Sequence, residues 1–181
     1  MEKKKLLLHS CCGPCSTSVI EKLKQEYDLT IFYYNPNIYP QEEYEKRLKE
    51  QIKYINLSSQ NIVVIDGLYE DNPIFEQAFK GLETCKEGGS RCEKCIYLRL
   101  KKPAEYASKN KFDIFASTLS VSPHKNATLI NTLGKQLEAE FNVEYLISDF
   151  KKQDGYLNSI KISKEYDLYR QKYCGCKYSI Y

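Results

Sequence analysis

Five short apolar runs alternate along the chain with longer stretches of helical periodicity. Each run is nearly continuous in apolar character, which is typical of strands buried on both faces of a parallel sheet. Strands that are joined through helices form right-handed βαβ units. The pattern therefore predicts an α/β fold with a five-stranded parallel, Rossmann-like sheet. The predicted strands occupy residues 5–10, 29–35, 61–66, 112–118 and 143–148.

The stretches between the runs carry helix signals. Ser18 stands three places before Glu21, which is the spacing of a capping box at a helix start. Pro103 falls inside another stretch and predicts a kink or a break there, because proline lacks the backbone N–H that a helix needs. The predicted helices cover residues 16–25, 40–57, 95–110 and 125–141.

The length and composition suit one folded domain. A chain of 181 residues can bury one good core and is short for two, and 42% hydrophobic with 28% charged residues is a folded rather than a disordered profile. No segment approaches the roughly 20 apolar residues that span a bilayer, and the first apolar run is too short for a signal peptide. We therefore expect a single domain over residues 1–181, cytoplasmic and without a membrane segment.

Unusual polar segments follow the predicted strands. Cys11 and Cys12 come directly after the first strand, NPNIYP after the second and STLSVSPHKN after the fourth. In open parallel α/β sheets the ligand crevice lies outside the carboxyl ends of the strands. The sequence therefore predicts that these segments meet at one edge of the sheet and form a site there.

Seven of the eight cysteines fall into three groups, while Cys85 stands apart and is interpreted as structural or incidental. Thiols of cytoplasmic proteins are kept reduced, so grouped cysteines indicate metal binding or redox chemistry. Two of the groups contain C-x-x-C spacing, which lets two sulfurs bind one metal ion or cluster. If both pairs begin helices, free N–H groups there favour thiolates. The groups are Cys11, Cys12 and Cys15; Cys92 and Cys95; and Cys174 and Cys176.

Three interpretations of these thiols remain open. A zinc-stabilised RNA-binding module would use four ligands, for which Cys92, Cys95, Cys174 and Cys176 are available. A dithiol oxidoreductase would use a single C-x-x-C pair. Seven grouped cysteines exceed both needs, which favours a redox cluster accompanied by a further metal ion or by reactive thiols.

Six segments, in order from Leu6 to about Ser179, resemble the QueH family of epoxyqueuosine reductases. They are HSCCGPC, YYNPNIYPQEEYEKR, GGSRCEKCIYLRL, STLSVSPHKN, DFKKQDG and LYRQKYCGCKYS. The resemblance implies a cobalamin-independent oxidoreductase that converts epoxyqueuosine in the tRNA anticodon stem-loop to queuosine. It also implies a [4Fe–4S] cluster with an adjacent mononuclear iron, and a sheet of the adenine-nucleotide α-hydrolase (HUP) type with a cysteine-rich C-terminal extension.

This resemblance leads to expectations for individual residues. The expected cluster ligands are Cys12, Cys15, Cys92 and Cys95. The expected ligands of the second iron are Cys11, Cys174 and Cys176, with Asp113 or Asp149 as the candidate carboxylate that replaces one thiol. Removing the epoxide oxygen as water also requires protons, for which the candidate catalytic residues are His124, Asp149 and Tyr173.

The end of the chain is suited to RNA. Residues 151–181 hold seven basic against three acidic residues and six of the sixteen tyrosines. Basic groups neutralise phosphate and aromatic rings stack on unpaired bases, so we expect this segment to close the site over the tRNA. No G-x-G-x-x-G follows a predicted strand, so the electrons are expected from a separate donor protein. The expected substrate-binding residues are Asn35, Asn37, Lys152, Arg170 and Lys172.

Overall fold

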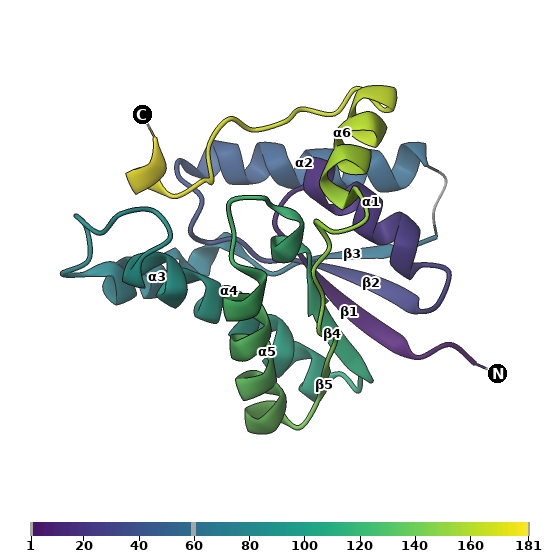
Figure 1. Ribbon diagram of the computed structural model, residues 1–181, viewed down its shortest axis with the longest axis horizontal. Coiled ribbons are helices and arrows are strands. Elements are labelled where there is room, and N and C mark those ends of the chain that lie inside the picture. Colours follow the sequence, from purple (N-terminus) through teal and green to yellow (C-terminus); the bar gives the residue numbers. More distant parts are fainter. Residues whose placement is uncertain (1, 59–60, 181) are drawn as a thin grey trace.

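Within the part of the chain that the computed structural model describes, residues 2–58 and 61–180, five strands form one sheet in the order β3-β2-β1-β4-β5 (Figure 1). All four neighbouring pairs are parallel. The predicted α/β fold with a five-stranded parallel sheet is therefore confirmed. The strands are β1 (Lys5–Ser10), β2 (Asp28–Tyr33), β3 (Val63–Asp66), β4 (Ile114–Ser117) and β5 (Glu144–Tyr145).

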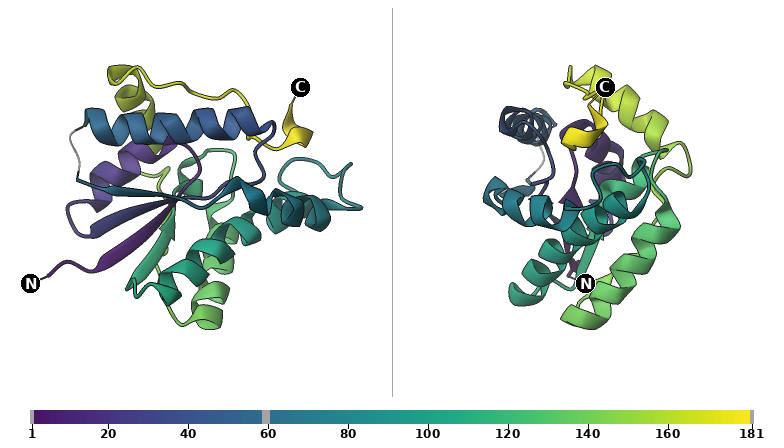
Figure 2. Two further views of the ribbon diagram at one scale, coloured as in Figure 1. Left: turned by 180° about the vertical axis from the view of Figure 1, so that it is seen from behind. Right: turned by 90° about the vertical axis from the view of Figure 1, so that its left-hand side faces the viewer.

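Helices cover both faces of this sheet (Figure 2). One face carries α1 (Gly13–Leu23), α2 (Gln41–Leu57) and α6 (Gly155–Glu165), and the other carries α3 (Asn72–Phe79), α4 (Ser90–Lys109) and α5 (Ala127–Phe141). Three short 3₁₀ turns complete the described elements: η1 (Tyr69–Asp71), η2 (Thr118–Val121) and η3 (Lys177–Ser179). No described helix is long and apolar enough to cross a membrane.

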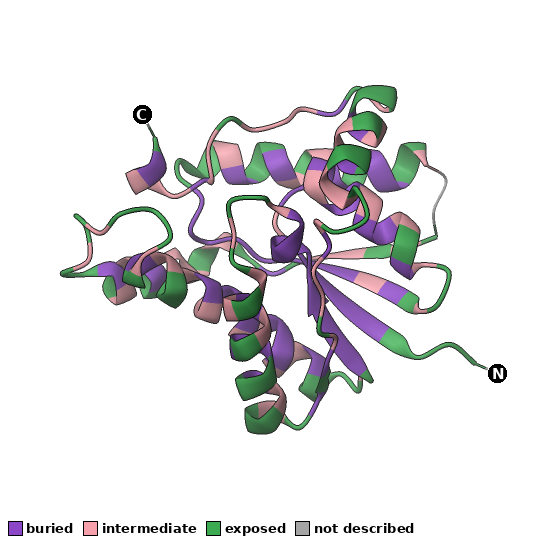
Figure 3. Cartoon of the chain, in the orientation of Figure 1, coloured by how far each residue is buried: buried purple, intermediate pink, exposed green. Residues whose placement is uncertain are grey.

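The central strand explains why the helices occupy two layers. Leu6, Leu7 and Leu8 of β1 are all fully buried, and the strand is purple beyond its exposed beginning in Figure 3. Successive side chains of a strand point to opposite faces. Leu7 accordingly joins the core beneath α4 and α5, whereas Leu6 and Leu8 join the core beneath α1 and α2. Fully burying each leucine stabilises the fold by about 2 kcal/mol.

Two helix details differ from the sequence prediction. Helix α1 begins at Gly13 with Cys12 as its N-cap, so Ser18 lies inside the helix, where its hydroxyl donates to the carbonyl oxygen of Gly155 at 2.8 Å. The predicted capping box at Ser18 was therefore wrong. Helix α4 is a single helix through Pro103, so of the predicted kink or break the break does not occur. Pro103 is buried on the core side of α4, next to the core residues Leu100, Ala104 and Ala107.

Strand β1 marks the place where a site can form. It lies between β2 and β4 in the sheet. The chain first adds β2 and β3 on one side of β1 and then crosses over to add β4 and β5 on the other side. Connections diverge at such a point and leave a crevice at the carboxyl edge. Cys11 and Cys12 follow β1 at this edge, and η2 follows β4. Residues 166–180, called the tail below, run from α6 back along α2 toward the same edge (Figures 1 and 2).

Candidate metal centre

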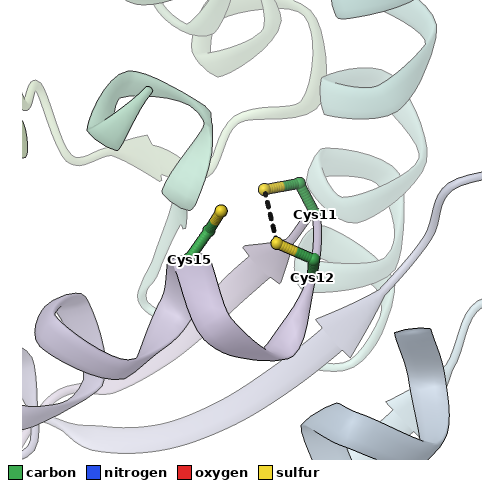
Figure 4. A group of neighbouring side chains, drawn as sticks. All are labelled: Cys11, Cys12 and Cys15. Atoms are coloured by element: carbon green, nitrogen blue, oxygen red, sulfur yellow. Dashed lines mark hydrogen bonds between the residues drawn. The ribbon is translucent and has the colours of Figure 1, made fainter. Parts of the chain in front are cut away.

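Three thiols form the most compact cysteine group and are called the thiol trio (Figure 4). The sulfurs of Cys11, Cys12 and Cys15 all lie within 4.8 Å of one another, and those of Cys11 and Cys12 share a 4.0 Å hydrogen bond. Cys12 caps α1 and Cys15 is the third residue of that helix, so the trio faces the free N–H groups of its first turn.

Gly13 makes this arrangement possible because α1 meets α2 at that residue. A Cβ atom on Gly13 would lie 2.7 Å from the backbone nitrogen of Gln51. The Gln51 amide oxygen in turn accepts hydrogen bonds from the hydroxyls of Ser10 at 2.6 Å and Ser16 at 2.8 Å. The loop that carries the trio is therefore held against α2 by close backbone packing and by a buried polar network.

The trio has the spacing of metal ligands. A tetrahedral ion with metal–sulfur bonds of about 2.3 Å places its sulfur ligands about 3.8 Å apart, close to the 4.0 Å between Cys11 and Cys12. Hydrogen bonds to Cys12 and Cys15 lower the pKa of Cys11, whereas burial raises the pKa of Cys12. The pKa of Cys15 rises to about 12, mainly through its hydrogen bond to Cys11. Cys11 is thus the most readily ionised thiol of the trio.

Four more cysteines form a second thiol group: Cys92, Cys95, Cys174 and Cys176. The pKa of Cys95 is raised to about 12, mainly by burial, and the nearby Cys174 and Cys176 thiols contribute to this rise. Burial likewise raises the pKa of Cys176, with added effects from Cys174 and Cys92. The four thiols, which come from α4 and from the tail, therefore lie within electrostatic reach of one another.

The beginning of α4 repeats the arrangement found in α1. Cys92 is the third residue of α4, as Cys15 is of α1, and its sulfur accepts a hydrogen bond from the backbone N–H of Gly88 at 3.2 Å. Cys95, the sixth residue of α4, lies in its second turn, so the expectation of a C-x-x-C pair at a helix N-terminus is met by Cys12 and Cys15 and, in α4, by Cys92 alone. Such positions stabilise thiolate and anionic metal–sulfur groups.

The tail brings Cys174 and Cys176 to this place because α2 holds it. The buried guanidinium of Arg47 donates to the carbonyl oxygens of Cys174 at 3.0 Å and Tyr173 at 3.2 Å, and is itself fixed by Glu43 at 2.7 Å. Gly175 lies against Arg47 with φ of +118°, a conformation that favours glycine. Its carbonyl oxygen accepts from the backbone N–H of Tyr39 at 2.7 Å.

Two basic side chains, Lys125 and Arg99, lie near the thiol groups. The Nζ atom of Lys125 donates to the Cys174 sulfur at 3.4 Å. Burial opposes its charge, but the thiolates of Cys174 and Cys11 outweigh this effect and raise the pKa of Lys125. Arg99 is buried, and its positive charge acts to lower the pKa of both Cys11 and Cys95. The site thus contains positive charges that favour the ionised form of the thiols beside them.

A cleft of about 580 Å³ opens beside both thiol groups. Its lining includes Cys11, Cys15 and Cys174 together with Arg99, Lys125 and Gln171. Two buried polar atoms of these lining residues, Arg99 Nε and Gln171 Oε1, have no hydrogen-bond partner among the described residues. Compact sulfurs, nearby cations and unpartnered polar atoms in one cleft together fit an anionic metal–sulfur group.

Besides the three cysteines, four of the predicted functional residues line this cleft: His124, Tyr173, Arg170 and Lys172. His124 is exposed on the loop after η2. Tyr173 donates its hydroxyl to the carbonyl oxygen of Tyr39 at 2.6 Å, and burial raises its pKa, so this phenol is a poor proton donor. Arg170 packs over the ring of Tyr156, with 5.7 Å between guanidinium carbon and ring centre.

The predicted asparagines lie behind the cleft wall. Asn35 is fully buried, donates to the carbonyl oxygen of Ser10 at 2.8 Å and accepts from Arg99 Nη2 at 2.6 Å. Asn35 thus orients the guanidinium of Arg99, which lines the cleft. Its side chain has no free group for a substrate, so the prediction that it binds substrate is corrected. Asn37 is only 5% exposed, and neither polar atom of its side chain has a partner among the described residues.

Two predicted residues lie in the loop after β5, outside the lining of the cleft. Asp149 pairs with Lys151 at 3.2 Å, and Lys151 also donates to the carbonyl oxygen of Lys125 at 3.1 Å. Lys152 has a side chain that is 77% exposed and does not line the cleft. Asp149 is thus linked to the cleft wall through a lysine, whereas Lys152 points into solvent.

Asp113 does not belong to the metal centre. Its carboxylate accepts from the backbone N–H of Lys5 at 2.8 Å, at the amino end of the sheet. Cys11 follows the other end of β1, about 20 Å away at about 3.3 Å per residue along the strand. The prediction of Asp113 as an iron ligand was therefore wrong, because residues before and after a parallel strand lie at opposite edges of the sheet.

His9 is a structural residue. Its Nδ1 lies 2.9 Å from the Ser117 hydroxyl and its Nε2 lies 2.9 Å from the carbonyl oxygen of Tyr34. Complete burial lowers its pKa to about 3, so the ring is neutral. Both ring nitrogens are occupied between β1, β2 and β4, and the ring cannot reach a substrate.

The sequence analysis missed four residues that shape the site: Arg47, Arg99, Lys125 and Gln171. Lys125 and Gln171 fall within the segments STLSVSPHKN and LYRQKYCGCKYS that carry the family resemblance, next to His124 and Arg170. Arg47 and Arg99 lie in the middle of amphipathic helices, where an arginine normally faces solvent. No local pattern distinguishes these two from the exposed cations around them.

Comparison with known proteins gives a consistent result. The family model described as "Epoxyqueuosine reductase QueH" matches residues 6–181. A protein of that name from Staphylococcus epidermidis is 43% identical over 183 residues, which cover 98% of this chain and 77% of that protein. Another from Thermotoga maritima is 36% identical, over 97% of this chain and 90% of its own length.

A solved structure shares the fold. The crystal structure of a predicted subunit of tRNA methyltransferase from Methanocaldococcus jannaschii superposes with a TM-score of 0.57, covering 90% of this chain and 74% of that chain. The two sequences are 18% identical over the match. This likeness concerns the α/β architecture alone.

Proposed function

The chain belongs to the QueH family of epoxyqueuosine reductases, and on this basis we propose that it reduces epoxyqueuosine in tRNA to queuosine. The reaction removes the epoxide oxygen as water, leaves an alkene, and consumes two electrons and two protons. The observation that carries the proposal is the compact thiol trio at a cleft that Cys174, Arg99 and Lys125 also line.

The seven thiols are proposed to hold a [4Fe–4S] cluster and an adjacent iron ion. We assign Cys12, Cys15, Cys92 and Cys95 to the cluster and Cys11, Cys174 and Cys176 to the iron. The sulfurs of Cys11 and Cys12 lie 4.0 Å apart, which supports the assignment of these two residues to two adjacent metal centres. These centres would supply the electrons and a Lewis-acidic ion for the epoxide oxygen.

Side chains of the cleft are proposed to prepare the site for this chemistry. Arg99 and Lys125 carry positive charge beside the thiols and stabilise the ionised sulfurs and the negative charge that develops on the substrate oxygen. His124, exposed on the cleft rim, is proposed to deliver a proton to that oxygen. Cys12 is fully buried, which keeps bulk water from its sulfur.

The substrate is proposed to be held by the basic end of the chain. Arg170 and Lys172 line the cleft and would neutralise backbone phosphates of the anticodon loop. Tyr156 and Tyr173 line it too and offer ring faces on which unpaired bases can stack. Residues 151–181 would thus close the site over the tRNA, and a separate protein would deliver the electrons.

The experiment measures the metal content of the protein together with its turnover of epoxyqueuosine-containing tRNA. Protein purified without oxygen should be brown, contain more than four irons per chain with acid-labile sulfide, and convert epoxyqueuosine-containing tRNA to queuosine, as judged by nucleoside mass. A colourless protein with one zinc and no turnover would reject the reductase in favour of a zinc-stabilised RNA-binding module. Conversion that needs thiols but no iron would instead indicate a dithiol oxidoreductase.

His124→Ala separates proton delivery from metal binding. It should lower turnover by about 10² to 10⁴-fold, the usual contribution of a general acid, and leave iron and sulfide unchanged. Pro123→Ala, next to it on the same exposed rim, is the matched control and should retain turnover. Equal turnover of the two variants would remove His124 from the mechanism.

A further inference from the structure

The amide of Gln171 lies directly against the thiol trio. Its Nε2 donates to the Cys12 sulfur at 3.1 Å and to the Cys15 sulfur at 3.7 Å. A primary amide has two N–H groups, so one side chain can serve two sulfurs. Its Oε1 is buried and has no hydrogen-bond partner among the described residues. The contacts with the two sulfurs therefore fix the orientation of the Gln171 amide.

We propose that Gln171 is a positioning residue that holds the Cys12 and Cys15 sulfurs and sets how strongly they donate electrons to a bound metal. The inference rests on the proposed metal centre. A hydrogen bond to a ligand sulfur withdraws electron density from it, and such contacts raise the reduction potential of an iron–sulfur cluster. Gln171 would thereby make the centre easier to reduce.

The orientation of the amide supports this role. The opposite orientation would turn Oε1 toward the sulfurs and repel them once they are ionised. An unpartnered buried carbonyl oxygen destabilises a fold, so the contacts from Nε2 to sulfur must offset this cost. The described structure thus favours the orientation that suits thiolates.

Holding the tail is a task that other residues perform. Arg47 binds the carbonyl oxygens of Tyr173 and Cys174, and the backbone N–H of Tyr169 donates to Glu50 at 2.9 Å. These contacts lie on both sides of Gln171 and connect the tail to α2. Loss of the Gln171 amide should therefore leave the tail in place and change the sulfurs alone.

The test uses two variants and a control. Gln171→Leu removes the donor with similar bulk, and Gln171→Glu replaces it with a carboxylate that cannot donate and adds negative charge. Gln136→Leu, exposed on α5, is the matched control. Each full-length protein is first checked for helix content and thermal unfolding, so that a folding defect in one variant leaves the other to decide.

Two readouts are measured for every protein. In reconstituted enzyme, an anaerobic redox titration should show a more negative reduction potential for Gln171→Leu, and a larger shift for Gln171→Glu. In metal-free protein titrated with Co²⁺, the sulfur-to-cobalt charge-transfer band should move to lower energy in both variants, because an unbonded sulfur releases charge more easily. The control should match the wild type in each measurement.

The outcomes separate this inference from the proposed function. Potentials and cobalt bands equal to those of the wild type would overturn the role of Gln171 even if the enzyme reduces its tRNA substrate. A wild-type protein that binds Co²⁺ without thiolate bands would overturn it as well. Shifted cobalt bands in a protein without turnover would support the inference and reject the reductase assignment.

Discussion

The guanidinium of Arg47 donates to the carbonyl oxygen of Cys174 at 3.0 Å, so a helix near the start of the chain fixes a thiol near its end. Arg47→Met would break this contact and leave the Glu43 carboxylate without its cation, with the Tyr169 hydroxyl still donating to it, in a site where the side chains of Arg47 and Glu43 are 2% and 11% exposed. We expect the free energy of unfolding to fall by about 3 kcal/mol, as for other broken buried pairs.

The same variant should lose bound iron and be cut faster by trypsin after Lys172, because the tail is released. Lys49→Met, on the exposed face of α2, is the control and should behave as the wild type. Iron per chain and the rate of cleavage are the measurements. Full iron content and unchanged cleavage in Arg47→Met would show that α2 does not hold the tail.

Gly175→Ala should disturb the same region by steric overlap. A Cβ atom there would lie 2.8 Å from Ile38 and 3.1 Å from Arg47 Nη1, on a backbone with φ of +118°. Gly81→Ala has a similar backbone, φ of +79°, but meets nothing within 4 Å. Both variants should lose about 1–3 kcal/mol of stability through strain, but only Gly175→Ala should lose iron. Equal iron contents would refute the steric argument.

Gly134→Ala tests the packing of α5 on β5. Alanine in a helix interior normally adds about 0.5–1 kcal/mol over glycine, but a Cβ atom here would overlap the buried ring of Tyr145. Overpacking of a core costs about 1–3 kcal/mol, so we expect net destabilisation in urea unfolding. Thr132→Ala, exposed on the same helix, should be neutral or slightly stabilising. A more stable Gly134→Ala protein would contradict this view of the interface.

Lys172→Ala should weaken tRNA binding through loss of one phosphate contact. The slope of log K against log salt should become shallower by about 0.7, the value for one contact to single-stranded nucleic acid. Lys109→Ala, at the far end of α4 and paired with Glu105, is the control. Affinities measured at several salt concentrations decide the point. Parallel slopes for all three proteins would place the RNA elsewhere.

The apolar runs were sufficient to predict the sheet, because a strand such as β1 has to be buried on both faces. They also predicted which edge would carry Cys11 and Cys12, since the end of a parallel strand fixes that edge. The same rule, had it been applied to Asp113, would have excluded it: this residue precedes its strand. Pro103 shows the limit of local rules, because α4 continues through this buried residue.

The side chains that organise the site could not be predicted in the same way. Arg47 and Arg99 are buried because their partners, the carbonyl oxygen of Cys174 and the side chain of Asn35, come from distant parts of the chain. A sequence pattern reports only neighbours along the helix, where both arginines resemble solvent-exposed cations. Their role follows from the tertiary structure.

The contact between Gln171 and Cys12 spans 159 positions of the sequence. During synthesis the trio therefore leaves the ribosome long before the residues that complete its surroundings. On the proposed assignment of the thiols, full metal loading would wait until the tail has emerged and docked on α2. A truncated or stalled chain would present reduced, unprotected thiols, and metal insertion would then act as a checkpoint on the completeness of the polypeptide.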